Sequence, residues 1–250
     1  MKPYLLMLLL IASVMDAAAE TPLPPRLRQE IIDRLAQGSV PLQNGGVRRV
    51  DGSQGVAITV DLCPSSKPLD RPLFTRLVAL SRIHPAPVAI AVTGRWLDTH
   101  PDDFRWLREM ERSHLLDITW VNHSDTHPYE PSLPLSRTFL LTEGIDLERE
   151  ITAVEEKLRR EGVTPSPFFR FPGLVADRRT FDAVLSRGLI PIGSDAWLAK
   201  GEEPRGGSII LVHGNGNEPP GVARLLTLLE TTSLPERLVS LTDLMAGGSP

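Results

Sequence analysis

The sequence predicts an α/β fold in which about seven parallel strands form a barrel-like sheet, with one N-terminal helix outside it. Three observations support this prediction. From residue 55 onward, short apolar runs alternate with amphipathic helical segments, which is typical of repeated βα units. The apolar runs are continuous, as expected for strands buried on both faces. Polar residues follow directly after several of these runs, where the active sites of barrels are built.

The elements are expected in the following order. Leu27, Ile31 and Leu35 recur at helical spacing and Gly38 ends the pattern, which predicts the N-terminal helix. Residues 40–55 contain several turn formers and are expected to be mainly loop. Strands are expected over residues 56–60, 88–92, 116–121, 168–171, 189–193, 208–212 and 238–241. Helices are expected after Asp70 and over residues 101–111, 146–160, 177–187 and 221–230.

Bulk composition limits the partners and the means of stabilisation. The chain has 250 residues, of which 41% are hydrophobic, enough for one good-sized core. Its formal net charge is −4 with no long run of one sign, so neither nucleic acid nor an anionic membrane is an expected partner. Cys63 is the one cysteine, so an internal disulfide is excluded and the core must stabilise the fold.

The N-terminus has the pattern of a secretory signal. A basic Lys2 precedes an apolar run over residues 4–14, and three alanines at 17–19 offer small residues for cleavage before Glu20. The run is too short to span a membrane comfortably. We therefore expect a signal peptide over residues 1–19, an N-terminal helix with its flanking segments over 20–55, and a catalytic domain over 56–245. The mature protein is expected to be periplasmic or secreted, without stable membrane insertion.

Two histidines directly after the third predicted strand are candidate metal ligands. His123 and His127 are four residues apart, a spacing that brings two imidazoles to one side of a helical turn or tight loop. An isolated pair of this kind is more often a surface or capping feature. Here the pair follows a strand and accompanies other polar blocks at strand ends, which favours metal binding. Among divalent ions, zinc suits imidazole best.

Two charged residues at the ends of other strands form a candidate base and its partner. Asp61 follows the first strand, where it fits either a turn aspartate or a general base that takes a proton from the attacking water. Arg170 ends a strand after two phenylalanines. A buried arginine needs a carboxylate partner, and Asp61 is the natural candidate. Such a neighbour would keep Asp61 ionised. The alternative for Arg170 is a structural salt bridge elsewhere.

A second histidine site is expected at the end of the strand over 208–212. His213 can donate a proton to a leaving nitrogen or oxygen, and Asp195 is expected to hydrogen-bond it and set its orientation. Trp197 and Leu211 are candidates for the apolar wall of a pocket for a small acyl methyl group. Core packing is the alternative role for Trp197.

Together these blocks resemble the five motifs of the polysaccharide deacetylase family of carbohydrate esterases, in family order. The matching residues are 59–61, 122–128, 170–173, 195–197 and 211–213. The resemblance covers roughly residues 56–241. It implies a distorted (β/α) barrel and metal-dependent removal of acetyl groups from N- or O-acetylated sugars. It also implies that Asp61 is the base, with Arg170 as its partner, and that His213 is the acid, tuned by Asp195. His123 and His127 become metal ligands, and Pro172 joins Trp197 and Leu211 at the substrate pocket.

One position departs from the family pattern. The family has a second aspartate, a metal ligand, where this chain has Leu62, which has no donor atom. Three interpretations follow. Asp61 itself is the third ligand, which is the favoured interpretation. Cys63 supplies a thiolate, since strand alternation puts it on the same side as Asp61; the alternative for Cys63 is a small buried residue. In the third interpretation, the site binds metal weakly or has none.

The function expected from these residues is an exported hydrolase that uses one divalent metal ion, zinc by preference, to deacetylate a glycan or a small acetylated substrate. Two alternatives stay open. The protein is a catalytically lapsed relative that binds carbohydrate, or it is a metal-dependent amidase on a substrate that is not a sugar.

Overall fold

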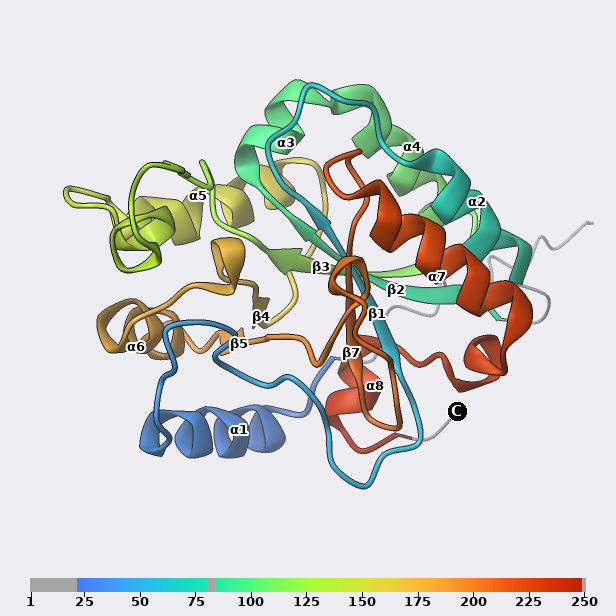
Figure 1. The fold of residues 1–250 in the computed structure, drawn as a ribbon, viewed down its shortest axis with the longest axis horizontal. Helices are drawn as coiled ribbons and strands as arrows, with labels where there is room; N and C mark the ends of the chain where they lie inside the picture. The colour runs from blue at the N-terminus through green and yellow to red at the C-terminus, as the bar shows by residue number, and fades with distance from the viewer. Residues whose placement is uncertain (1–21, 81–83, 249–250) are drawn as a thin grey trace, which may run out of the picture.

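The computed structural model describes residues 22–80 and 84–248 (Figure 1). The predicted signal peptide over residues 1–19 and its cleavage site lie outside the described residues. Seven parallel strands form one curved sheet in the order β5-β4-β3-β2-β1-β7-β6. The strands are β1 Ala57–Leu62, β2 Ala86–Val92, β3 Leu116–Asn122, β4 Phe168–Phe169, β5 Ile190–Pro191, β6 Ala196–Trp197 and β7 Ile209–His213. The predicted α/β fold class, a distorted barrel of about seven parallel strands, is confirmed.

One predicted strand is wrong, and another element takes its place. Residues 238–241 do not form a strand, because Leu238 makes only an isolated bridge with Val56 and helix α8 begins at Leu241. The strand that completes the set of seven is β6, an edge strand that pairs with β7. This strand of two residues continues directly into a 3₁₀ helix at Leu198, so its apolar residues do not stand out as a separate strand pattern in the sequence.

The helices cover both faces of the sheet (Figure 1). The α-helices are α1 Pro25–Gln37, α2 Arg71–Leu80, α3 Gly94–Thr99, α4 Pro101–Arg112, α5 Leu147–Arg160, α6 Arg178–Ser186, α7 Pro219–Thr231 and α8 Leu241–Met245. The 3₁₀ helices are η1 Leu135–Arg137, η2 Phe139–Leu141, η3 Pro172–Leu174, η4 Leu198–Lys200 and η5 Leu234–Arg237. Successive residues of β1 divide between two cores. Ile58, Val60 and Leu62 pack with α2, α4 and α7, whereas Ala57 shares a core with α1, α6 and α8.

The segment before β1 lies across the open side of the sheet. Val47 bridges Ile192, just after β5, and Arg49 bridges Ser208, just before β7. A Cβ atom on Gly46 would lie 2.3 Å from the Pro191 carbonyl oxygen, so this close approach requires glycine. The N-terminal segment therefore connects the part of the sheet next to β5 with the part next to β7.

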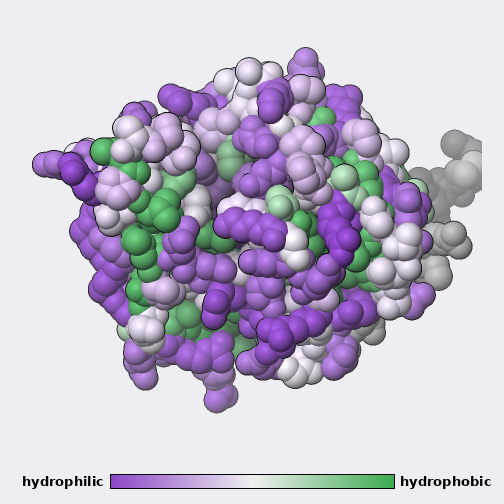
Figure 2. Space-filling view, viewed as in Figure 1, coloured by the Kyte–Doolittle hydropathy of each residue, from purple (hydrophilic) through white to green (hydrophobic). Residues whose placement is uncertain are grey.

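The visible surface is mainly hydrophilic, and hydrophobic residues gather toward its left side, near the loop that precedes α5 (Figure 2). Within residues 22–80 and 84–248, no helix has both the length and the apolar character needed to cross a membrane.

Candidate metal and catalytic site

At the end of β1, alternate side chains face either the candidate site or the apolar core. Side chains alternate along a strand, so Thr59 and Asp61 face one side while Leu62 faces the other. Leu62 is fully buried in the apolar core between the sheet and the helices. Cys63, the residue after the strand, is 6% exposed and lies with Asp61 beside His123. The position that departs from the family pattern therefore belongs to the core in this chain.

The loop after β3 holds the two candidate histidine ligands. His123 to His127 form an irregular loop, in which Ser124 and His127 have positive φ angles of 69° and 46°. Such backbone angles are strained for residues other than glycine, so the surrounding contacts must hold them. Gly94 makes room for the loop, because a Cβ atom there would lie 1.8 Å from Asp125 Oδ1.

Helix α5 holds this loop through hydrogen bonds. The buried Glu150 carboxylate accepts from the Thr126 backbone N–H at 2.9 Å and from its hydroxyl at 2.6 Å. The Glu150 carbonyl accepts from the Asp125 N–H at 2.9 Å. Lys157 donates to the Asp125 carboxylate at 2.7 Å. Two residues between the histidines are therefore tied to one helix.

Three side chains converge in a group that could hold a metal ion. The ligand atoms of Cys63, His123 and His127 all lie within 4.8 Å of one another. His123 Nδ1 lies 2.8 Å from the Arg170 carbonyl oxygen, which can only accept, so Nδ1 carries the proton. His123 Nε2 then carries the lone pair and can accept from the Cys63 thiol, whose Sγ atom lies 3.5 Å away. Burial lowers the pKa of His123, which favours the neutral form that binds metal.

The surroundings of Cys63 favour its ionised form. Burial raises the pKa of a thiol, but His127 and His213 oppose this through charge and hydrogen bonding. The net result lowers the pKa of Cys63 to about 7. A thiolate and two imidazoles are a donor set that fits zinc. Asp61, the third ligand favoured from the sequence, lies outside this group of three and 3.6 Å from His123 Nε2.

Asp61 and Arg170 lie together beside the three donors, as the sequence predicted. Arg170 Nη1 is 3.9 Å from Asp61 Oδ1, and both side chains are almost completely buried. Arg170 Nη2 donates to the Thr59 hydroxyl at 2.8 Å, which fixes the guanidinium. Asp61 Oδ1 has no hydrogen-bond partner among the described residues, so this oxygen is free to accept a proton.

His213 has a different partner from the one expected. Its Nδ1 atom lies 2.7 Å from a Glu218 carboxylate oxygen, which also accepts from Trp197 Nε1 at 2.8 Å. Burial alone would lower the pKa of His213, but hydrogen bonds with Cys63 and Glu218 raise it well above its ordinary value. These contacts favour the protonated form of His213.

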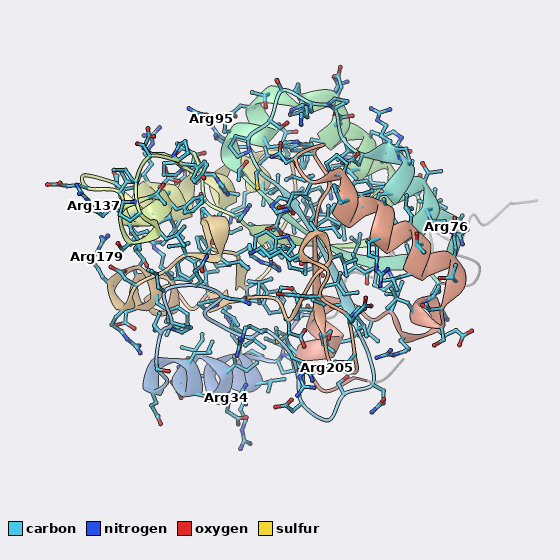
Figure 3. All side chains as sticks on the ribbon, in the orientation of Figure 1. Arg34, Arg76, Arg95, Arg137, Arg179 and Arg205 are labelled. Carbon is cyan, nitrogen blue, oxygen red and sulfur yellow. The ribbon has the colours of Figure 1, made fainter. Side chains whose placement is uncertain are left out.

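Asp195 faces two arginines and not His213, and strand register gives the reason. Its carboxylate oxygen lies 3.9 Å from Arg49 Nε and 3.6 Å from Arg205 Nε. Because Ala196 pairs with Ile210 in the parallel β6–β7 ladder, Asp195 is level with the start of β7. His213 is at the other end of that strand, roughly 13 Å away at the usual rise per residue. Arg205 likewise lies at the end of β7 near α8 (Figure 3).

The three predicted pocket residues have different surroundings. Trp197 is half-buried, and its ring centroid lies 5.9 Å from that of His213, so it borders the candidate acid. Leu211 is buried beside it in the β6–β7 ladder and lies two residues before His213 on the same side of the strand. Pro172 is buried at the start of η3, two residues after Arg170.

Sequence reasoning missed Glu218 and Glu150. Glu218 follows a short glycine- and asparagine-containing loop after His213, where no periodic pattern indicates which side chain turns back. Glu150 lies on the first turn of α5, where an acidic residue is usual for electrostatic reasons alone. Its burial was the informative feature, and burial of a single glutamate is not visible in a sequence.

Solved structures with a similar fold are carbohydrate esterases and their relatives. No family model matches the sequence. A family 4 carbohydrate esterase from Bacillus anthracis aligns with a TM-score of 0.61 at 18% identity, over 91% of this chain and 96% of that one. The chain has the fold of the family 4 carbohydrate esterases. The family resemblance inferred from the five motif blocks is thereby confirmed at the level of fold.

Two further structures with this fold differ in activity. The chitin deacetylase from the fungal pathogen Colletotrichum lindemuthianum has a TM-score of 0.56 at 18% identity, over 84% of this chain and 95% of that one. A family 4 pseudoenzyme from Bacillus anthracis has a TM-score of 0.56 at 16% identity, over 82% of this chain and 69% of that one. The fold therefore occurs both in deacetylases and in a pseudoenzyme, so activity must be argued from the side chains of this site.

Proposed function

We propose that this protein is an exported, metal-dependent hydrolase that removes acetyl groups from an N- or O-acetylated glycan. The observation that carries the proposal is the convergence of Cys63, His123 and His127 beside the Asp61–Arg170 pair and His213. In this proposal the ligands are Cys63, His123 and His127. The fold shared with deacetylases supports the substrate class.

Cys63 replaces Asp61 as the third ligand in this assignment. The thiolate belongs to the group of three donors, and its lowered pKa makes the ligating form available near neutral pH. A bound zinc ion would polarise the acetyl carbonyl and lower the pKa of water toward neutrality. Asp61, with one free carboxylate oxygen, is left available as a base.

The remaining steps belong to side chains of the chain itself. Asp61 takes a proton as water attacks the acetyl carbon, and Arg170 keeps this carboxylate ionised and in place. His213 donates its proton to the leaving nitrogen or oxygen as the bond to the acetyl carbon breaks. Glu218 fixes His213 through Nδ1, so that Nε2 is the donating atom. The products are acetate and a free amine or hydroxyl. Trp197 borders the acid and is proposed to contact the acetyl group.

The test combines metal content with acetate release from N-acetylated chitotetraose and from an O-acetylated oligosaccharide. We expect about one zinc per chain, loss of hydrolysis on chelation, and recovery when zinc is returned. Cys63→Ser should lose metal, whereas Cys63→Asp, which restores a carboxylate donor, should retain part of it. His114→Ala is the control, because His114 is exposed at the other end of β3. Hydrolysis that survives chelation would contradict the proposal.

A second candidate is a lapsed relative that binds carbohydrate without hydrolysing it. The observation in its favour is the pseudoenzyme with the same fold, together with the leucine at position 62. Binding of the oligosaccharides without acetate release, in protein that has been loaded with zinc, would support this candidate over the hydrolase.

A further inference from the structure

A pair of stacked aromatic rings connects a candidate metal ligand with the surface. The His127 ring contacts Phe139 edge to face, with centroids 5.5 Å apart. Phe139 in turn stacks against Tyr129 at 5.0 Å, with an interplanar angle of 18°. Phe139 is 7% exposed, whereas Tyr129 is 61% exposed. One face of Tyr129 therefore lies on a buried ring, and much of the rest of the side chain is open to solvent.

Phe139 has a strained backbone, and its ring fits into a space beside a glycine. Its φ angle is 54°, which is strained for an aromatic residue. Its ring lies over Gly173, where a Cβ atom would come within 2.4 Å of it. The glycine in the block after Arg170 thus makes room for this ring. A strained residue in a space kept open by glycine is the kind of feature that clusters at functional sites.

Tyr129 is held in place close to this ring. The backbone N–H of Glu130 donates to the hydroxyl of the buried Thr138 at 3.0 Å. This hydrogen bond links the residues next to Tyr129 and Phe139, so the stack is constrained from the backbone as well as by the rings. A preorganised aromatic face costs little entropy when a ligand binds to it.

We infer that Tyr129 binds a sugar unit next to the one that is deacetylated, so that the substrate contains at least two linked units. This inference rests on the proposed function. The acetyl group has to lie beside His127, and one ring separates Tyr129 from that position, which leaves Tyr129 for a neighbouring unit. An aromatic ring offers a flat apolar face with a polar tip, which suits the C–H face and hydroxyl rim of a pyranose. Exposed or half-exposed Leu135 and Leu133 lie in the same loop, where hydrophobic residues gather in Figure 2.

The test separates binding from hydrolysis. Affinity for N-acetylated chitotetraose and for a tetrasaccharide from peptidoglycan is measured by calorimetry, in the inactive His123→Ala background. Tyr129→Ala should weaken binding of one or both about three- to tenfold, and Tyr129→Phe should restore it. Leu42→Ala, which removes an exposed hydrophobic side chain outside this loop, should leave binding unchanged. The melting temperature of each variant shows whether the fold is intact.

In the active protein, Tyr129→Ala should lower kcat/KM on the tetrasaccharides about three- to tenfold, mainly through KM. Hydrolysis of N-acetylglucosamine should change less than twofold. An equal loss on the monosaccharide, or no loss on either, would overturn the inference, as would absence of binding of both tetrasaccharides. Binding that depends on Tyr129 in a protein that never releases acetate would support a sugar site at Tyr129 and would count against the proposed function instead.

Discussion

At the scale of single residues, the site depends on which side of β1 each side chain faces. Asp61 and Cys63 face the candidate metal group, and Leu62 between them is buried in the apolar core. A leucine at position 62 and a thiol at position 63 are therefore compatible with a group of donors on one side of the strand. A donor one residue farther along the chain lies on the side where the histidines are.

Leu62→Asp is predicted to harm the protein and not to restore a metal ligand. A carboxylate at this position would be placed among Val60, Phe74 and Leu73 without a partner. We expect the free energy of unfolding in urea to fall by roughly 3 kcal/mol or more, with no gain in zinc affinity. Leu62→Met, which conserves volume, should cost less than about 1.5 kcal/mol. Tighter zinc binding with unchanged stability would show that residue 62 turns toward the site.

A matched pair of substitutions tests which carboxylate serves His213. Glu218→Gln removes the charge that hydrogen-bonds Nδ1, so we expect kcat on an acetylated tetrasaccharide to fall about tenfold or more with little change in KM. Asp195→Asn makes the same chemical change at the carboxylate between Arg49 and Arg205, and should reduce kcat less. The reverse order of effects would favour the partner expected from the sequence.

At the scale of elements, the loop that carries His123 and His127 depends on α5 as well as on β3, the strand that precedes it. The strained φ angles of Ser124 and His127 persist because the residues between them are bound to Glu150 and Lys157. Mutating a side chain that holds a metal ligand in its orientation typically lowers metal affinity by about 10- to 100-fold. The helix is thus part of the site although it contributes no donor to the group of three.

Glu150→Ala should weaken zinc binding about tenfold or more, because the backbone of the loop loses its carboxylate acceptor. Zinc affinity is measured by competition with a chromophoric chelator. Glu156→Ala is the matched control, since it makes the same substitution on the exposed side of the same helix. Equal affinity in the two variants would mean that the loop keeps its geometry without α5.

At the scale of the whole molecule, one ion would join β1 and the loop after β3, two parts of the chain separated by about sixty residues. A ligand that binds only the folded state stabilises it by mass action. Zinc at about one hundred times its dissociation constant contributes about 2.7 kcal/mol.

We therefore expect zinc to raise the melting temperature by roughly 5–10 °C for a chain of this size. His127→Ala should remove most of this increase, because it deletes one of the three donors. His114→Ala should retain it. A melting temperature of the unmodified protein that stays unchanged across a full zinc titration would argue against a metal site that assembles in the folded state.

The sequence by itself was sufficient to predict the class of fold and to indicate most of the side chains that the structure brings together at one edge of the sheet. Alternating apolar runs and helices are properties of local patterning, so the barrel-like sheet and six of the strand positions followed from them. The proximity of the candidate residues could be expected because the carboxyl ends of parallel strands meet at one edge; these candidates are Asp61, His123, His127, Arg170 and His213. Only the structure decided that Cys63 joins the histidines and that Glu218, not Asp195, contacts His213. Those outcomes depend on strand register and on which side chains turn back from a loop, which are tertiary properties that residue spacing does not contain.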